Sequence, residues 1–310
     1  MEKNNKKLGY ILMFITVIIW GLDNVLVKSL LTDISPNLLT YIRLLTTTFG
    51  VTILTSIGKR KYIKGTFDKK YLILIFGMGI SLVIYYLLSI NGLNLTKAVI
   101  SEFLSTSLTT VFTILIMSIF IKEERQEFFD KYVIIALIVS LIGTYLTTVG
   151  DNNINIDFGA ILIIISCVFW GMYMTMYKKI NDSISVVRVS RDLDFVALSI
   201  YTLFLLLTQE FNQLFALDIM IIIKVSLVAI LIDIGTILTY YVAIRIISGV
   251  KCSILSLLSP IIAFTLSFLW LKERITLMQL GGCILLFASS LVLIIKEYME
   301  AKKDRINTLN

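Results

Sequence analysis

The sequence predicts an all-α membrane protein whose ten transmembrane helices form two inverted repeats of five helices each. Three observations predict this fold: a low charged fraction, ten apolar runs of membrane-spanning length, and an internal repeat. Of the 310 residues, 57% are hydrophobic and only 16% are charged, whereas a water-soluble domain carries about 25% charged residues. A spanning helix uses about 20 apolar residues, so ten helices take roughly 200 positions. The remainder suffices for tails and short loops, but not for a large domain outside the membrane.

The apolar runs place the ten expected helices along the chain. We expect them at 8–31, 36–57, 71–93, 97–121, 131–149, 157–179, 190–209, 218–244, 251–271 and 277–296. The first run is too long for the apolar region of a signal peptide and no small-residue cleavage site follows it, so it should remain as a span. Pro36 stands where a helix tolerates proline, at its first turn. Pro260 falls inside the ninth run and predicts a kink or a freed carbonyl there.

The distribution of Lys and Arg predicts the orientation. Basic residues gather in the N-terminal tail, in the loops around 58–70, 122–131, 178–191 and 245–251, and in the C-terminal tail. The opposite side has only Lys97, Lys272 and Arg274. Cytoplasmic loops carry the excess of Lys and Arg. We therefore expect both termini in the cytoplasm of a multi-pass protein of the cell inner (plasma) membrane.

The chain repeats itself at an offset of 150 residues. Trp20-Gly21 matches Trp170-Gly171, Lys28 matches Lys178, and Ile121-Lys122-Glu123 matches Leu271-Lys272-Glu273. We therefore divide the chain into residues 1–150 and 151–310, the second unit including a cytoplasmic tail. Five spans is an odd number, so the second unit must enter the membrane inverted. Inverted repeats are typical of secondary transporters, with the substrate site near the midplane between the halves.

Residue counts exclude several kinds of chemistry. The sequence has no histidine, which excludes His-based metal sites and histidine general bases. Its three cysteines lie far apart in apolar runs and are expected to be buried core residues. The net charge of +7 fits cytoplasmic loops better than nucleic-acid binding. We expect no catalytic residues, no metal and no cofactor.

Several motifs resemble one transporter family. Trp20-Gly21 followed by Lys28, and then Pro36 and Arg43 opening the second span, look like the start of an EamA-type drug/metabolite transporter. The stretch from Ser259-Pro260 to Lys272-Glu273, followed by Gln279-Leu280-Gly281-Gly282, is similar to a further segment of that family. The resemblance implies a ten-helix inverted-repeat fold, alternating access, and export or exchange of small metabolites, often amino acids. The first half departs from the family pattern, because Thr109-Thr110 stand where a proline is usual.

Charged residues within the spans are candidates for function, because burying them in a membrane is costly. At about 1.5 Å per residue, Arg43 lies about 10 Å and Glu102 about 8 Å below the outer surface. The first band of charges is expected near that depth and consists of Asp23, Lys28, Arg43 and Glu102. The second band is expected near the cytoplasmic face and consists of Arg191, Asp192, Asp194, Arg245 and Lys251. These bands are either ion-paired gates that open alternately or static pairs that fix the helices.

Asp233 is expected to stand alone near the midplane, where it would bind a proton or a substrate ammonium group, or make a structural hydrogen bond. Aromatic residues within spans can wall a ligand site, although each can equally serve helix packing. The expected substrate-binding residues are Trp20, Asp23, Asn24, Tyr86, Glu102, Trp170, Tyr173 and Asp233. The expected gating residues are Lys28, Arg43, Arg191, Asp192, Asp194, Arg245 and Lys251.

The sequence therefore indicates a secondary transporter of small metabolites. The expected partners are a small-molecule substrate, the lipid bilayer and protons as coupling ions, with no nucleic acid, for a monomer or homodimer. The sequence contains no nucleotide-binding motif, so transport would be driven by a gradient or by exchange. One alternative is a non-transporting scaffold or receptor. An intramembrane enzyme is a weaker alternative, because the sequence has no G-x-G-D motif and no H-E-x-x-H motif.

Overall fold

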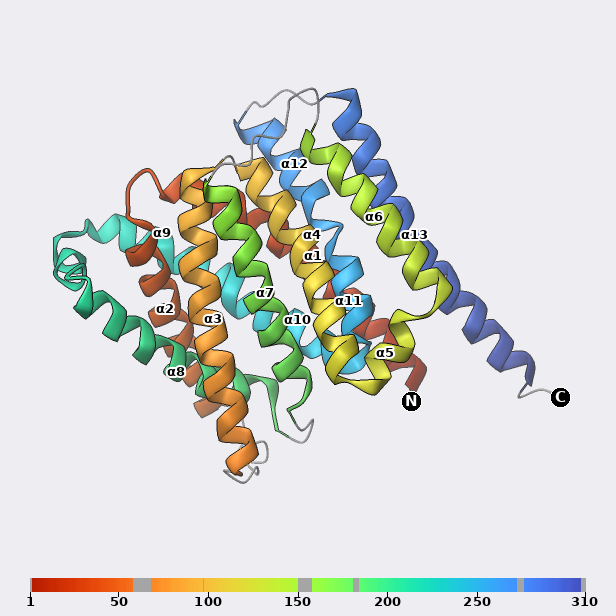
Figure 1. Cartoon of the computed structure of the whole chain (residues 1–310). Coiled ribbons are helices and arrows are strands. Elements are labelled where there is room, and N and C mark those ends of the chain that lie inside the picture. The colour runs from red at the N-terminus through yellow and green to blue at the C-terminus, as the bar shows by residue number, and fades with distance from the viewer. Residues whose placement is uncertain are drawn as a thin grey trace.

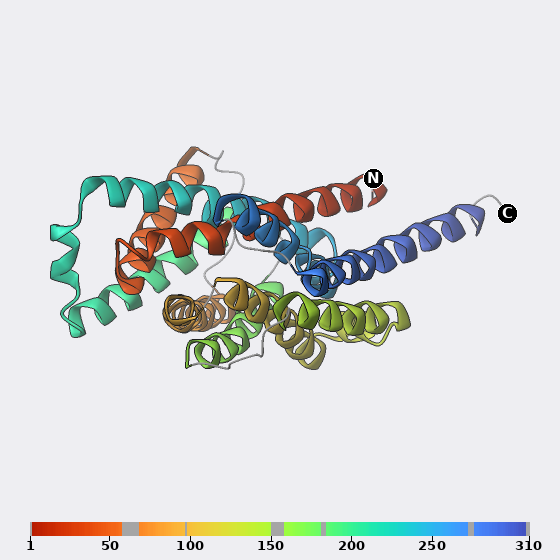
Figure 2. The ribbon, with the colours of Figure 1, turned by 90° about the horizontal axis from the view of Figure 1, so that it is seen from above.

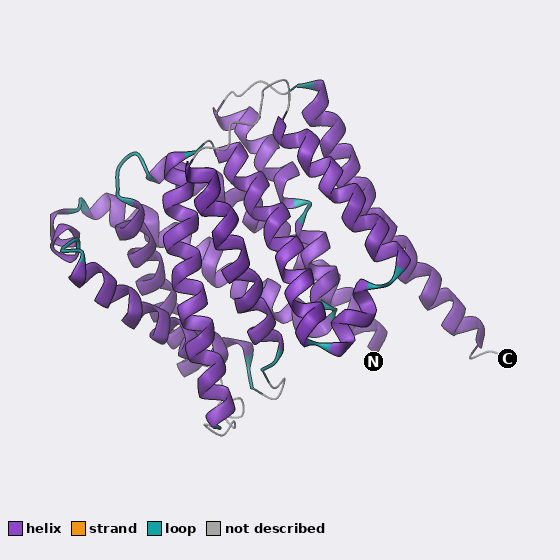
Figure 3. Cartoon of the chain, viewed as in Figure 1, coloured by secondary structure: helices purple, strands orange, loops and turns teal. Residues whose placement is uncertain are grey.

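The chain folds into a bundle of helices. The computed structural model describes residues 2–57, 68–96, 98–149, 158–180, 184–271 and 276–307. Within these ranges the secondary structure is helical and contains no strand (Figure 3). Lys59, Arg60, Lys61, Lys64, Lys97, Lys272, Glu273 and Arg274, on which part of the predicted orientation and repeat depends, lie outside the described residues.

The helices of the first half follow the apolar runs closely (Figure 1). They are α1 (Glu2–Leu30), α2 (Pro36–Ile57), α3 (Lys69–Leu95), α4 (Ala98–Phe120), α5 (Lys122–Phe128) and α6 (Lys131–Val149). α2 begins at Pro36, where the missing N–H costs no helical hydrogen bond. Asp68 caps α3, because its side chain accepts a hydrogen bond from the backbone N–H of Lys70.

The second half contains more interruptions. Its helices are α7 (Phe158–Lys178), α8 (Val186–Leu207), the 3₁₀ helix η2 (Phe211–Ala216), α9 (Ile219–Ala229), the π-helical turn η3 (Ile230–Ile234), α10 (Gly235–Ile246), α11 (Gly249–Ser256), α12 (Ser259–Leu271) and α13 (Leu277–Asn307). The expected range 218–244 is thus one helical path whose middle turn, η3, is wider than an α-helix. The interruption expected from Pro260 is observed, since α11 ends at Ser256 and α12 begins at Ser259.

Length and composition make several of these helices candidate membrane spans. Among the described residues, five are long and apolar enough to cross a membrane: Lys6–Leu30, Pro36–Ile57, Lys69–Leu95, Phe158–Lys178 and Ile219–Ile246. Shorter apolar helices include Leu104–Phe120, Lys131–Gly143, Gly249–Ala263 and Leu280–Ser289. The total of ten spans stays a prediction.

The surface of the bundle is apolar and parts of its interior are polar. Large side chains such as Phe49, Ile57 and Phe76 are exposed on the outside, whereas Arg43 and Glu102 are buried. A lipid environment requires this distribution, because exposing a hydrocarbon side chain to lipid costs no free energy, whereas exposing a charged side chain to lipid is costly. We call the end of the bundle where α1 begins the inner end, and the end where α1 finishes the outer end.

The two halves pack against each other, because helices of each half contact helices of the other half. α1 packs on α10 and α12 of the second half, while α7 packs on α3 and α4 of the first half. The pairs α2·α8 and α6·α13 also join the halves, and α6 and α13 lie side by side in both views (Figures 1 and 2). The residue range of α8 is that of α2 shifted by 150. The 150-residue offset therefore relates not only sequence motifs but also helices that pack against each other, such as α2 and α8.

Two glycines show this relation at atomic scale. A Cβ atom on Gly21 would lie 2.5 Å from the Cβ of Ile262, and one on Gly171 would lie 2.9 Å from the backbone of Phe112. Gly171 follows Gly21 by 150 positions, and Ile262 follows Phe112 by the same interval. Both distances are too short for a side chain, so each glycine allows its helix to approach a helix of the other half.

Candidate functional site

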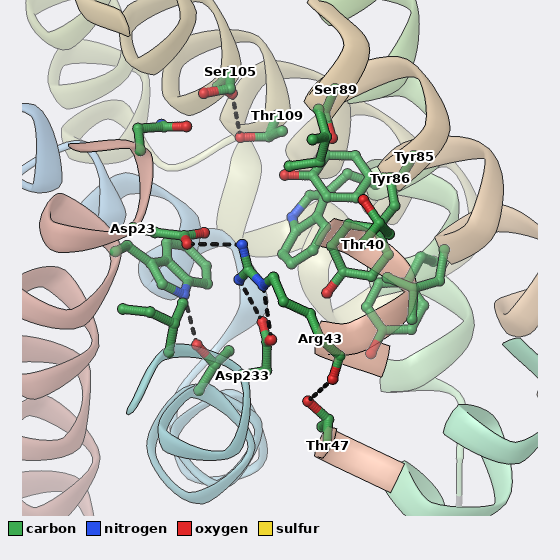
Figure 4. A pocket seen from close by; sticks show the side chains of 18 of the residues that line it. Asp23, Thr40, Arg43, Thr47, Tyr85, Tyr86, Ser89, Ser105, Thr109 and Asp233 are labelled. Carbon is green, nitrogen blue, oxygen red and sulfur yellow. Dashed lines mark hydrogen bonds and ion pairs between the residues drawn. The ribbon is translucent and has the colours of Figure 1, made fainter. Parts of the chain in front are cut away.

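A cavity of about 130 Å³ lies between the two halves. Its walls come from α1 to α4 of the first half and from α7, α8, η3, α10 and the α11–α12 junction of the second half. Figure 4 shows charged, hydroxyl and aromatic side chains pointing into the same space. All eight expected substrate-binding residues line this cavity: Trp20, Asp23, Asn24, Tyr86, Glu102, Trp170, Tyr173 and Asp233. Their binding of a substrate stays a prediction.

Arg43 lies at the centre of an ion cluster in this cavity (Figure 4). Its Nε and Nη2 atoms donate to the two carboxylate oxygens of Asp233 at 2.9 and 2.6 Å, and its Nη1 lies 3.0 Å from Asp23. The Arg43 side chain is 5% exposed, compared with 30% for Asp23. A bidentate pair of this kind fixes both partners in orientation. The cluster thus joins α1, α2 and η3.

The expectation of a lone carboxylate at Asp233 is wrong, because Arg43 binds it. Depth along a helix can be counted from the sequence, but the direction in which a side chain points depends on helix packing. α2 packs against both α9 and η3, which brings Arg43 opposite Asp233. The π-helical turn that contains Asp233 also changes the rotation of the residues that follow it.

Glu102 is buried in a network of neutral donors. Its carboxylate accepts hydrogen bonds from the side chains of Asn24, Thr106 and Ser259, the last two at 3.0 and 3.1 Å. The side chain is 5% exposed. Ser259 is the first residue of α12, directly after the break that follows Ser256 and directly before Pro260. Glu102 therefore joins α1, α4 and the α11–α12 junction near the outer end.

Asp194 lines the same cavity from α8. It is 5% exposed, and its Oδ2 atom has no hydrogen-bond partner in the described part of the chain. The neighbouring pair formed by Arg191 and Asp192, with a shortest distance of 2.6 Å, does not include it. Asp194 was expected in an ion-paired band with these two residues, and that expectation is wrong. Two positions along a helix turn a side chain by about 200°, so Asp192 and Asp194 face opposite ways.

Aromatic rings form one wall of the cavity. The indole N–H of Trp20 donates to the hydroxyl oxygen of Thr236 at 2.9 Å. The ring of Trp170 lies 5.9 Å from that of Trp20, 4.9 Å from that of Tyr85 and 5.5 Å from that of Tyr173, measured between centroids. The two tryptophans that mark the sequence repeat therefore meet edge to face.

Tyrosines close the cavity toward the inner end. The Tyr173 hydroxyl donates to that of Tyr241 at 2.7 Å, and the rings of Tyr177 and Tyr241 lie 4.7 Å apart. All three side chains are buried. The guanidinium of Arg245 lies 5.5 Å from the centre of the Tyr177 ring and donates to the backbone carbonyl of Ile184. Arg245, an expected gating residue, thus lies beyond the tyrosines.

Lys28 does not join the acidic residues of its expected band. Its ammonium group donates to the backbone carbonyls of Leu93, Asn94 and Thr96, at 2.7, 3.2 and 3.0 Å. These carbonyls terminate α3, where a positive charge is favourable. The free carbonyls at a helix end can bind any nearby cation and therefore compete with carboxylates for a lysine. For this reason the depth of Lys28 in the membrane does not predict its partner.

The other expected gating residues lie near the inner end, outside the cavity lining. The hydroxyl of Tyr71 on α3 donates to Asp192 at 2.8 Å, joining α3 to α8. Lys251 lies 3.3 Å from Glu127 of the α5 helix. The inner band is therefore a set of contacts between helix ends.

Comparison with known protein families shows which family the chain belongs to. A family model of the EamA-like transporter family matches residues 7–149 and again 157–295. The chain belongs to the EamA-like transporter family. The family model thus matches the chain twice, once in each half. The family assignment makes the chain a multi-pass membrane protein of a transporter family, with two repeats.

Structural comparison agrees on the fold of this EamA-family chain. A solved crystal structure, described only as that of a protein, has a TM-score of 0.70 and 14% sequence identity. The similarity covers 93% of this chain and 96% of the other. No curated protein matches the sequence.

Sequence reasoning missed part of this EamA-family site. Ser101, Ser105 and Thr109 line the cavity and are spaced by four residues, which places them on one face of α4. That spacing was visible in the sequence. Glu124 was also missed: it is 2% exposed and accepts hydrogen bonds from the backbone N–H groups of Gly249 and Val250 at 2.9 and 3.0 Å. It caps the start of α11, a role that no local sequence pattern indicates.

Proposed function

We propose that this protein is a secondary transporter, an exporter or exchanger of small metabolites that works by alternating access. One observation carries the proposal: a polar cavity with charged and aromatic walls lies between the two repeats of a bundle whose outer surface is apolar. Secondary transporters built from repeats hold their substrate at such an interface. Because the chain has no nucleotide-binding motif, a gradient or exchange would drive the movement.

The cavity limits the size of the substrate. Each water-sized group needs about 10–15 Å³ of such a cavity, so 130 Å³ admits roughly ten non-hydrogen atoms. This is the size of an amino acid or a related small compound. A peptide or a large lipid would require a different arrangement of the helices.

We propose that the inner end faces the cytoplasm of the plasma membrane, as the Lys and Arg distribution predicts. Residues 1–150 and 151–310 would then be the two inverted units. In this orientation the buried Tyr173, Tyr177 and Tyr241 separate the cavity from the cytoplasm. Movement of one unit against the other would open this barrier and close the outer end around Glu102.

A scaffold or receptor function explains less. Such a protein would have no reason to bury charged residues around a cavity between two repeats, since each buried charge is costly. An intramembrane enzyme would need a nucleophile with its base or a paired-aspartate motif, and the sequence offers neither.

Flux through proteoliposomes tests the proposal. The purified full-length protein would be reconstituted and assayed for uptake and exchange of a panel of labelled amino acids and small metabolites, with and without a pH gradient. Trp170→Ala changes the cavity wall, and Phe49→Ala changes an exposed side chain of α2 as a matched control. We expect flux of some panel members, lost in the first variant and kept in the second. Absence of flux for the whole panel under both conditions would favour the scaffold alternative.

A further inference from the structure

The charged residues that line the cavity are not balanced. Four carboxylates, those of Asp23, Glu102, Asp194 and Asp233, face a single basic side chain, that of Arg43. This is the full set of charged residues among the described residues that line it. An excess of buried negative charge requires a counterion or protons, because isolated ions are strongly disfavoured away from water.

Arg43 cannot balance all four acids. It uses Nε and Nη2 for Asp233 and its remaining terminal nitrogen for Asp23. Glu102 receives hydrogen bonds from Asn24, Thr106 and Ser259, which solvate its carboxylate without neutralising it. Among the described residues, Asp194 is the acid left without either kind of partner.

Asp194 is accompanied by other unpartnered polar atoms. The hydroxyl oxygen of Ser190, one turn earlier on α8, is 1% exposed and has no hydrogen-bond partner in the described structure. Ser89 of α3, which is 8% exposed and which Figure 4 shows pointing into the cavity, also has no hydrogen-bond partner in the described part of the chain. Buried polar groups are nearly always satisfied, so unsatisfied ones facing a common space indicate that this space receives a bound group. Two of these three residues lie on one face of α8.

The surroundings of Asp194 favour a cation as that bound group. Asp233, Tyr173 and Tyr241 line the same cavity as Asp194. The cavity that Asp194 lines holds more carboxylates than basic side chains, so it repels an anion and attracts a cation. Aromatic faces also attract cations, most strongly where water is excluded.

We propose that the cavity binds a small organic cation and that the carboxylate of Asp194 receives its ammonium group. The hydroxyl groups of Ser190 and Ser89 supply further oxygen acceptors, and the aromatic wall around Trp170 holds the apolar part of the molecule. The inference rests on the proposed function in one respect, since it names the substrate class of the same cavity.

Equilibrium binding tests the inference without relying on transport. The full-length protein in detergent would be titrated with 2-phenylethylamine and with 2-phenylethanol, which share a shape and differ only in the charged group. Binding would be followed by calorimetry. We expect saturable binding of the amine and much weaker binding of the alcohol. Equal binding of both compounds, or binding of neither, overturns the inference.

Substitution of Asp194 provides the second arm. Asp194→Asn keeps the shape of the side chain and removes its charge, and should lower the affinity for the amine about 10- to 100-fold, the range for a hydrogen bond to a charged group. Asp192→Asn, on the opposite face of the same helix, is the matched control and should retain full affinity. Unchanged amine affinity in Asp194→Asn overturns the inference. If this variant does not fold, the amine and alcohol titration of the unmodified protein still decides.

The flux assay separates this inference from the proposed function. Amine binding without flux of any compound would leave the Asp194 site intact and refute transport. Flux confined to neutral or anionic compounds, with no amine binding, would support transport and refute the cation site.

Discussion

The hydroxyl group of Tyr173 on α7 donates a hydrogen bond to that of Tyr241 on α10, with 2.7 Å between the oxygens. Both rings are buried, and both residues line the cavity at its inner end. The contact therefore does two things at once: it joins α7 to α10 and forms the floor of the cavity. Whatever opens the cavity toward the inner end has to separate this pair.

Tyr173→Phe should loosen the inner end. The substitution removes the donor and leaves the buried oxygen of Tyr241 without it, at a cost of about 1 kcal/mol in the free energy of unfolding. Cys252 is fully buried on α11 and lies near Tyr240 and Lys178. We expect thiol reagents to label it faster in the variant, as measured by mass spectrometry.

The control for this experiment is Tyr145→Phe, which makes the same change at an exposed position of α6. It should leave the labelling rate of Cys252 unchanged. Equal rates in all three proteins would show that the tyrosine pair does not hold the inner end closed.

Arg43→Leu should destabilise the protein strongly. Removing the buried guanidinium leaves Asp23 and Asp233 in the cavity without their partner, and breaking a buried ion pair in this way costs about 3–5 kcal/mol. Adding Asp233→Asn should restore part of this loss, because it removes one of the two unbalanced charges. Thermal unfolding in detergent measures both effects.

Lys70→Leu serves as the control for Arg43, since it removes an exposed basic residue. Its unfolding temperature should stay close to that of the unmodified protein. A double variant no more stable than Arg43→Leu alone would argue against electrostatic coupling between Arg43 and Asp233.

Lys28→Met and Lys178→Met should have similar effects, although the residues are 150 positions apart. Lys28 donates to the last carbonyls of α3, and Lys178 donates to the carbonyl of Ile244, near the end of α10, at 2.6 Å. A cation at a helix C-terminus contributes about 0.3–2 kcal/mol. We expect a loss of this size in each variant and none in Lys7→Met, where the side chain is exposed. A loss in only one variant would show that the two contacts are not equivalent.

The environment of Asp130, which lies between α5 and α6, predicts that the stability of the protein depends on pH in the acidic range. Burial disfavours its charged form, but hydrogen bonds from Lys296 and from the backbone of Tyr132 outweigh burial and lower the pKa of Asp130 below its usual value. Its folded pKa is lower than its unfolded pKa, so the contact stabilises fully above the usual value of about 3.9. That stabilisation is lost as the pH falls through the folded pKa.

Asp130→Asn tests this dependence. We expect the variant to unfold at a lower temperature than the unmodified protein near neutral pH. The difference should shrink when both are measured at pH values below the usual pKa of aspartate. A difference that stays constant or grows with acid would refute the role of the ion pair between Asp130 and Lys296.

Apolar runs predicted the helices well because lipid imposes a minimum length on any span. Depth counting also placed Asp23 and Arg43 in one band, and the structure pairs them. The same counting failed for Asp194, for Lys28 and for the partner of Asp233. In each case the outcome depends on helix rotation and on which helix ends lie nearby, and these are properties of the packed bundle.

The short helix α5 shows a second limit. Its residues look like a charged loop in the sequence, yet Glu124 is buried because the start of α11 offers two N–H groups without helical partners. The N–H groups that Glu124 binds lie more than a hundred positions away along the chain. The local sequence around Glu124 therefore does not predict this contact.

Glycine contacts recur in both halves, but the charges of the cavity do not. The positions related to Arg43, Asp194 and Asp233 by 150 residues are Leu193, Leu44 and Val83. Packing alone would give the inward-open and the outward-open conformation nearly the same free energy. The charges have no counterparts at the related positions of the other half, so they stabilise one of the two conformations more than the other. The empty protein should therefore populate mainly one conformation, with its cavity open to one side of the membrane, and should transport at different rates in the two directions.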